Sequence, residues 1–184
     1  ILLRKNFKKK IISTLKNKNA DILITFGCGK IPEKVFKNRK IKHFWNIHGG
    51  LSPWFRGSIT NFWPSYLLQP QFTGITLHKL SSQIDGGEIL LQTSCKLISS
   101  DGIHDLNCRS IQTFCKIFKK KLKNLRLKKN INGTKQIFHG KIWKKSDWSE
   151  KNLVMIYEKF NDKIVKYCKS NNLIKIKPKL IDNL

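Results

Sequence analysis

Residues 43–57 read HFWNIHGGLSPWFRG, an apolar aromatic run that ends in a glycine-rich loop. The run predicts a strand, because aromatic residues are common in strands and the glycines and proline mark its end. Asn46 and His48 are two positions apart, so their side chains point to the same face of that strand. Open α/β sheets bind ligands where a strand runs into a loop, and this stretch is therefore the first candidate site.

The neighbouring segments predict that this strand belongs to an α/β sheet. Residues 21–26 form a short apolar run typical of a buried strand, and a basic helix is expected before it over residues 5–18. Pro32 is suited to open a helix that ends near residue 36. Two strands separated by a helix imply a parallel pair with a right-handed crossover.

The rest of the chain alternates in the same way. Further strands are predicted over residues 73–79, 88–97 and 137–143, with a loop over 80–87. Helices are predicted over residues 58–68, with a break near Pro64, and over 102–125. The capping-box pattern at residues 147–150 is expected to start a last helix, whose apolar face runs from Leu153 to Tyr167.

Length and composition indicate one globular unit. The chain has 184 residues and 40% apolar residues, enough for a real core. No stretch approaches the roughly 20 apolar residues of a membrane span, and the opening residues lack the long apolar region of a signal peptide. A cytoplasmic protein with no membrane contact is expected.

The net charge of +26 has two competing explanations. It is typical of proteins that bind nucleic acid or an anionic membrane. However, only five of the 37 basic residues are arginine, and lysine, asparagine and isoleucine are all abundant. A phosphate-binding surface favours arginine's bidentate geometry, so a compositional bias of the source genome explains the charge equally well. Either way, the charge attracts anionic ligands.

The five cysteines show no metal-binding pattern. They form no Cys-x-x-Cys pair and have no ligand spacing with the five histidines, so we expect buried free thiols and no metal site. Cys108 and Cys115 are seven positions apart in a predicted helix, which predicts that both lie on its core-facing side.

Five short elements then occur in order: Asn46-x-His48, Pro53, Arg56-Gly57, Thr73-Gly74-x-Thr76-x-His78 and Asp85-x-Gly87-x-Ile89. Over residues 21–97 they resemble the folate-dependent formyltransferase family, which includes the glycinamide ribonucleotide, methionyl-tRNA and sugar-nucleotide formyltransferases. Residues 140–160 are similar to the C-terminal part of some members. Five elements in register are far more specific than a lone glycine motif.

The resemblance implies a Rossmann-like α/β fold with a mostly parallel sheet that has an antiparallel portion. Family members have several βα units before the strand that residues 21–26 match, so the chain is expected to be a fragment or truncated product without them. The expected division is an N-terminally incomplete catalytic domain over residues 1–125 and a C-terminal extension over 126–184, with a helix packed on the same domain.

By this resemblance Asn46, His48 and Asp85 match the catalytic residues, with 10-formyltetrahydrofolate as formyl donor and co-substrate, a primary amine as acceptor and no metal. These residue types suit the chemistry, because amine attack on a formyl carbon creates an oxyanion that needs hydrogen-bond donors. The Asn46 amide and a protonated His48 can donate, and Asp85 can keep His48 charged and relay the proton. Taken singly, a strand-end histidine is more often structural, and an aspartate before two glycines is more often a turn residue.

The resemblance also implies a pterin pocket for the donor, with Phe26, Gly27, Gly29, Ile31, Leu80, Ser81 and Ile84 as its binding residues. Core packing is an equal alternative for Phe26 and Ile31. Arg56 either binds a substrate anion or braces its loop. Thr76 and His78 are candidates for second-layer support or substrate contact, and His78 is expected to support the site more than to carry a proton.

The acceptor stays open among a sugar nucleotide, glycinamide ribonucleotide and aminoacyl-tRNA. A small-molecule amine is favoured over tRNA, because the sequence after Leu125 is short for a separate RNA-binding barrel. Gly49-Gly50 replaces a Pro-Ser pair of many relatives, and either admits a different acceptor or marks a subfamily. Two alternatives remain: a basic nucleic-acid-binding or inactive remnant protein, and a hydrolase of 10-formyltetrahydrofolate.

Overall fold

The computed structural model describes residues 20–29, 31–36, 41–125, 131–138 and 140–184. The helix predicted over residues 5–18 lies outside this part of the chain. The described elements follow in this order: β1 (Ala20–Phe26), α2 (Glu33–Phe36), β2 (Ile41–His48), β3 (Arg56–Gly57), α3 (Trp63–Tyr66), the 3-10 turn η1 (Pro70–Phe72), β4 (Gly74–Lys79), β5 (Ile89–Ser94), α4 (Ile103–Asn124), β6 (Ile142–Trp143), the 3-10 turn η2 (Lys145–Asp147), α5 (Glu150–Phe160) and α6 (Ile164–Ser170).

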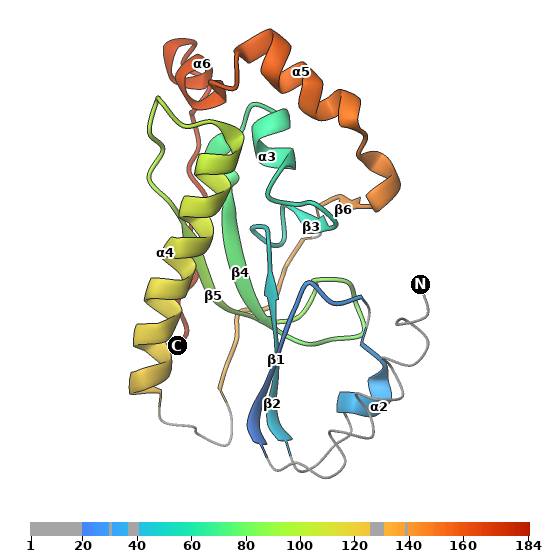
Figure 1. Ribbon diagram of the computed structural model, residues 1–184. Helices are drawn as coiled ribbons and strands as arrows, with labels where there is room; N and C mark the ends of the chain where they lie inside the picture. The colour runs from blue at the N-terminus through green and yellow to red at the C-terminus, as the bar shows by residue number, and fades with distance from the viewer. Residues whose placement is uncertain (1–19, 30, 37–40, 126–130, 139) are drawn as a thin grey trace.

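A mixed sheet in the order β1-β2-β4-β5 forms the centre of the molecule (Figure 1). β1 and β2 are parallel, as the helix between them predicts, whereas β2–β4 and β4–β5 are antiparallel. The mixed sheet confirms the expected fold class, and the antiparallel portion is the larger part of the described sheet. A second, two-residue pairing joins β3 to β6 in parallel.

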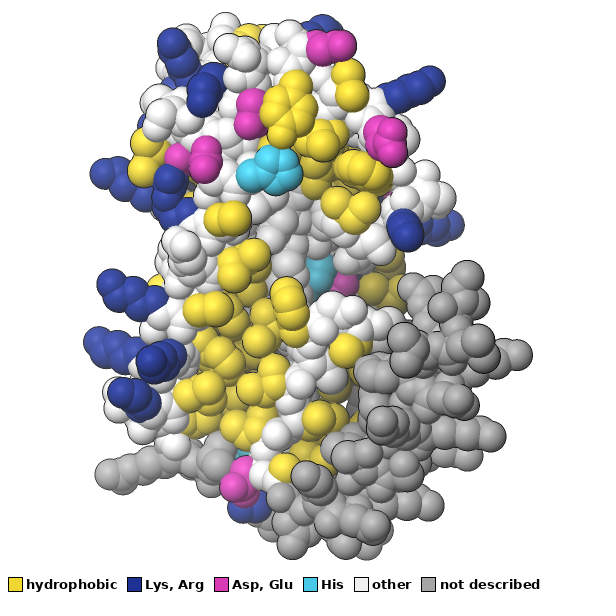
Figure 2. All heavy atoms as spheres, viewed as in Figure 1, with side chains coloured by type: hydrophobic (Ala, Val, Ile, Leu, Met, Phe, Trp, Pro, Cys, Tyr) yellow, Lys and Arg dark blue, Asp and Glu magenta, His cyan; other side chains and the backbone are white. Residues whose placement is uncertain are grey.

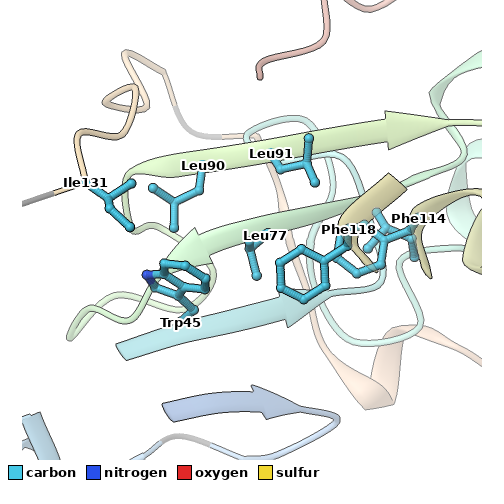
Figure 3. Close-up of a cluster of buried hydrophobic side chains, with 8 residues drawn as sticks. Trp45, Leu77, Leu90, Leu91, Phe114, Phe118 and Ile131 are labelled. Atoms are coloured by element: carbon cyan, nitrogen blue, oxygen red, sulfur yellow. The ribbon is translucent and has the colours of Figure 1, made fainter. Parts of the chain in front are cut away.

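One hydrophobic core lies between this sheet and α4 (Figure 3). Trp45 and Leu77 project from β2 and β4, and Phe114 and Phe118 of α4 stack at 5.2 Å between ring centroids. Trp45 and Leu77 are fully buried, and each large apolar side chain removed from water contributes about 1.5–3 kcal/mol to folding. This core fixes β2, the strand that carries Asn46 and His48.

A second core includes side chains of the segment that follows β2. It joins Phe55, Phe62 and Trp63 to Ile103 of α4 and to Ile156 and Ile164 of the C-terminal helices. Residues after 125 therefore contribute to the packing around the loop of the candidate site. The domain boundary expected at residue 125 stays a prediction.

The last helix differs from its prediction. The chain turns at Asn161 and Asp162, whose φ values are +47° and +51°, so the expected continuous helix is divided into α5 and α6. The start also shifts, because the Ser149 N–H, and not that of Asp147, opens the helix by donating to Asn152 Oδ1 at 2.7 Å. Tyr167, expected on the buried face, is 41% exposed.

The buried face of α4 also differs in part from its prediction. Leu106, Phe114 and Phe118 are buried, but Cys108 and Cys115 are exposed, so the predicted core-facing cysteine stripe is wrong. Of the five thiols only Cys168 is buried, where burial raises its pKa to about 11. Ile111 and Ile117 are exposed as well, and Figure 2 shows apolar side chains gathered on this side of the molecule.

Two other elements are shorter than predicted. The helix expected over residues 58–68 is reduced to the four residues of α3, because Ile59 adopts a positive φ of +56° and Pro64 lies inside the segment. The strand expected over residues 137–143 is reduced to β6. Within the described residues, no helix is both long and apolar enough to cross a bilayer.

Candidate active site at the end of strand β2

A cavity of about 820 Å³ opens at the carboxyl end of β1 and β2. Its walls come from the loops after β1, β2 and β4 and from β6 with the turn that follows it. Asn46, His48, His78 and Asp85 all line it. The two-residue spacing of Asn46 and His48 on β2 brings them to one cavity, and the antiparallel neighbour β4 places His78 opposite Asn46 in the register.

A chain of hydrogen bonds fixes the Asn46 amide. His78 Nδ1 lies 2.8 Å from the Lys79 carbonyl, which can only accept, so Nδ1 carries the proton and Nε2 is an acceptor. Asn46 Nδ2 donates to that Nε2 at 3.1 Å, and Thr25 Oγ1 donates to Asn46 Oδ1 at 2.8 Å. Both ends of the amide are thereby assigned, with Nδ2 on the side of Asp85.

His48 and Asp85 form the second pair of the site. His48 Nε2 lies 2.8 Å from the Phe55 carbonyl, so this nitrogen donates and the proton of a neutral ring is located there. His48 Nδ1 faces Asp85 Oδ2 at 3.3 Å. Both side chains are largely buried, with exposed fractions of 5% and 13%. The unprotonated nitrogen of His48 therefore faces a carboxylate that would stabilise an added proton.

Burial and charge determine the protonation states of this pair. Burial lowers the pKa of His48 below its usual 6.5, although the charge of Asp85 opposes the shift. Burial alone would raise the pKa of Asp85, but its contacts with the His78 and His48 rings and with the Gly57 N–H together hold it below 3.8. At neutral pH the site thus has an ionised Asp85 and a neutral His48. The sequence analysis expected a protonated His48, whereas burial leaves the ring neutral at this pH.

Several contacts hold the Asp85 loop in place. Gly57 N donates to Asp85 Oδ2 at 2.8 Å, and Gln136 Nε2 donates to the Asp85 carbonyl at 2.9 Å. The φ of Asp85 is +46°, a left-handed value that aspartate tolerates better than most residues. Gly87 is required nearby, because an added Cβ would lie 1.7 Å from the Lys79 carbonyl oxygen.

All seven predicted pterin-pocket residues line this cavity. Phe26, Gly27, Gly29 and Ile31 come from the loop after β1. Leu80, Ser81 and Ile84 come from the loop after β4. Phe26 is 63% exposed and Ile84 is 49% exposed, so neither belongs to a packed core.

Arg56 and Thr76 do not line the cavity. Arg56 is 2% exposed and its Nε donates to the Ile84 carbonyl at 2.9 Å, so it braces the loop over residues 80–87. Thr76 is fully buried and its Oγ1 donates to the Gly50 carbonyl at 2.7 Å. Both side chains position loops of the site and have no direct access to a ligand.

Sequence reasoning did not assign Thr25, Gln136 or β6 to the site. Thr25 pairs in register with Asn46 across β1 and β2, and its place near the carboxyl end of the predicted strand could have indicated this contact. Gln136 and β6 reach the site from the C-terminal part of the chain, and no motif connects them to it. Among the described residues, no cluster of three or more histidine, cysteine or acidic side chains could hold a metal ion.

Comparisons with known proteins agree on one family. Residues 3–122 match the family model of formyl transferase. The methionyl-tRNA formyltransferase of Buchnera aphidicola subsp. Acyrthosiphon pisum (strain Tuc7) is 30% identical over 163 residues, which cover 84% of this chain and 52% of that protein. The enzyme of the same name from Prochlorococcus marinus (strain MIT 9515) is 28% identical over 188 residues, covering 92% of this chain and 56% of the relative. The chain thus spans about half the length of these curated relatives.

Solved structures give the same result. The formyltransferase PseJ from Anoxybacillus kamchatkensis, in complex with UDP-4,6-dideoxy-4-formamido-L-AltNAc and tetrahydrofolate, has a TM-score of 0.64 and 27% sequence identity. That alignment covers 82% of this chain and 77% of the PseJ chain. Phosphoribosylglycinamide formyltransferase from Anaplasma phagocytophilum shares the fold with a TM-score of 0.53, at 24% identity over 62% of this chain and 56% of that one.

Proposed function

Because the chain belongs to the formyl transferase family, we propose that it transfers a formyl group from 10-formyltetrahydrofolate to the primary amine of an acceptor. The observation that carries the proposal is the pairing of His48 Nδ1 with Asp85 Oδ2 at 3.3 Å, beside the Asn46 amide in one cavity. An amide donor, a buried base and a carboxylate together meet the needs of acyl transfer to an amine.

Asn46 supports the proposal as the donor to the developing oxyanion. Attack by the acceptor nitrogen forms a bond to the formyl carbon, and the carbonyl electron pair moves to oxygen. One hydrogen of Asn46 Nδ2 is held by His78, whereas the other makes only a long 3.4 Å contact to Asp85. That weakly held hydrogen is available to the oxyanion. Loss of one such donor costs roughly 3–4 kcal/mol of transition-state stabilisation in comparable sites.

His48 moves the proton in this mechanism. The neutral ring accepts the proton that the attacking amine loses, at Nδ1, and the imidazolium is stabilised by Asp85. Collapse of the intermediate breaks the bond between the formyl carbon and N10 of the donor, and the proton passes from His48 to that nitrogen. The products are a formamide and tetrahydrofolate, so atoms and charge balance. Proton transfer of this kind contributes about 10²–10⁴ in rate.

Phe26, Ile31, Leu80 and Ile84 support a site for the donor's pterin ring. They line the same cavity as Asp85, and their apolar side chains suit a flat heterocycle whose polar edge is bound by backbone groups. The tetrahydrofolate in the PseJ complex is consistent with such a donor. The acceptor class remains open among amino-sugar nucleotides, glycinamide ribonucleotide and aminoacyl-tRNA.

The test is incubation with 10-formyltetrahydrofolate and a panel of primary amines, with tetrahydrofolate and formylated amine measured together. His48→Ala is expected to lower turnover about 10²–10⁴-fold. The matched variant His104→Ala, which replaces an exposed histidine of α4, should retain the parent's rate. Release of formate without any formylated amine would indicate hydrolysis and contradict the proposal, as would full activity of His48→Ala.

A further inference from the structure

One part of the cavity wall comes from β3, β6 and the turn that follows β6, and not from the pterin-pocket loops. Figure 1 places β3 and β6 above the loops that follow β1 and β4. Ser58, Ile59, Asn107, Trp143, Lys144 and Lys145 line the cavity on this side. No motif of the sequence predicted this wall, and the mechanism does not use it.

Charge distinguishes this wall from the rest of the cavity. Lys144 and Lys145 are the two cationic side chains among the described lining residues, and Asp85 is the one anionic side chain. Within the described part of the chain neither lysine has a carboxylate oxygen within 4 Å. Asp147, the nearest acidic residue in sequence, instead accepts from the Lys144 backbone N–H at 2.8 Å and lies 3.7 Å from Lys141 Nζ. Both lysine charges are therefore left for a ligand.

The backbone that carries these lysines is anchored to the catalytic loop. Trp143 stacks on buried Trp63 with ring centroids 3.9 Å apart and planes at 13°. Ser58 N donates to the Trp143 carbonyl at 2.8 Å, and Gly57, which binds Asp85, pairs with Trp143 in the register of β3 and β6. The lysines thus follow directly after a residue whose position is coupled to Asp85.

We propose that Lys144 and Lys145 bind a phosphate group of the formyl acceptor, so that the acceptor is a phosphorylated small-molecule amine. The inference rests on the proposed function, because it assigns the acceptor to this wall of the cavity and the donor to the pterin-pocket loops. Two lysines that line the same cavity wall suit a phosphoester or pyrophosphate, whose charge is delocalised over several oxygens. The glutamate carboxylates of the donor are the other anion available, and the test separates the two sources.

The experiment measures binding of inorganic pyrophosphate and of tetrahydrofolate by calorimetry, at fixed ionic strength. The double variant Lys144→Gln/Lys145→Gln is compared with the parent and with Lys151→Gln/Lys159→Gln, which removes two exposed charges of α5. The control is needed because a chain of net charge +26 attracts anions everywhere. Thermal unfolding of each variant checks that the fold is retained.

We expect the dissociation constant of pyrophosphate to rise about tenfold in the Lys144/Lys145 variant and to change less than about twofold in the control. The dissociation constant of tetrahydrofolate should stay unchanged in both. Equal weakening of pyrophosphate in both double variants would overturn the proposal, as would no weakening in either. A tenfold loss of tetrahydrofolate affinity would instead assign the lysines to the donor's carboxylates and also overturn it.

A kinetic arm separates this inference from the proposed function. O-phosphoethanolamine and ethanolamine present the same primary amine with and without a phosphate. The parent should formylate the phosphorylated amine with the lower KM, and the Lys144/Lys145 variant should lose that difference. Pyrophosphate binding that depends on these lysines, without any formyl transfer, contradicts only the proposed function. Formyl transfer with no preference for the phosphorylated amine contradicts only the phosphate subsite.

Discussion

Asp85 and Asp101 are both largely buried carboxylates, with exposed fractions of 13% and 3%, yet their partners differ. Asp101 binds both terminal nitrogens of Arg109, with one contact of 2.6 Å, and accepts from Ile98 N at 3.1 Å. Asp85 faces His48 and His78 at 3.3 and 3.5 Å. Arginine does not lose its proton in proteins, whereas histidine titrates near neutrality.

The difference shows how the partner decides the role of a carboxylate. Hydrogen bonding from Arg109, supported by its fixed charge, holds the pKa of Asp101 below 3.8, and the pair ties the start of α4 to the segment after β5. Asp85 is equally ionised, but its neighbour His48 has a lowered pKa and is free to take a proton. One carboxylate therefore stabilises structure, and the other stabilises a charge that appears during a reaction.

Replacing each aspartate by asparagine gives the sharpest contrast. Asp85→Asn should lower formyl transfer by about 10³-fold or more, because the imidazolium of His48 loses its counter-charge. Asp101→Asn should leave kcat of the folded protein within about twofold. Initial rates with the same donor and acceptor compare the two variants. An inactive Asp101→Asn or an active Asp85→Asn would remove the distinction.

Gly57→Ala tests the backbone that supports Asp85. The φ of Gly57 is +97°, and an added Cβ would lie 2.2 Å from the Trp143 carbonyl oxygen. The substitution should separate β3 from β6, move the Gly57 N–H away from Asp85 and lower kcat about 10²-fold. Turnover and the tryptophan fluorescence of the Trp63–Trp143 stack should change together. Unchanged fluorescence with full activity would contradict the coupling.

Asp101→Asn should have its main effect on stability. Loss of the Arg109 pair is expected to cost about 1–2 kcal/mol at neutral pH, since Arg109 is 30% exposed and solvent screens part of the interaction. The pKa of Asp101 is depressed, so its contribution is present above the unfolded value near 3.8 and is lost as pH falls through the folded value. Urea unfolding of the parent and the variant at pH 7 and pH 3 measures this loss of stability and its dependence on pH. An equal difference in unfolding free energy between parent and variant at both pH values would contradict the Asp101–Arg109 pairing.

Thr25→Val is expected to have a smaller effect on the reacting side. It keeps the shape of the side chain but removes the hydroxyl that donates to Asn46 Oδ1. Loss of one neutral hydrogen bond corresponds to about a tenfold lower kcat, with the KM for the donor unchanged. Thr25→Ser restores the hydroxyl and should restore the rate. If Val and Ser behave alike, the hydroxyl does not orient the amide.

The sequence predicted the parts of the site that depend on local periodicity. The apolar run predicts a strand over about residues 42–47, found over 41–48, and with it the two-residue spacing of Asn46 and His48. Turn residues predict the loop that carries Asp85. The sequence did not predict which face of α4 is buried. A spacing of seven indicates that Cys108 and Cys115 share one side of the helix, but not which side that is. Leu106, Phe114 and Phe118 determine that face through their packing on the sheet.

Contacts between distant segments were beyond prediction. The pairing of β3 with β6 involves only two residues on each strand, too few for a periodic signal. The division of the last helix depends on Asn161 and Asp162, residue types that tolerate a positive φ but do not require it. Gln136 reaches the Asp85 loop across 51 positions, and single-sequence patterns contain no information on such a pair.

The pH dependence of kcat/KM for formyl transfer tests the central claim most directly. A neutral His48 must accept the amine proton, so the rate should be constant above neutrality and fall as pH decreases through a midpoint below 6.5. The acceptor should be a weakly basic amine, so that its own titration does not coincide with this range. Asp101→Asn should show the same midpoint as the parent, whereas residual activity of Asp85→Asn should show a lower one. A rate that is flat from pH 5 to 8, or that rises on acidification, would contradict the role of the His48–Asp85 pair.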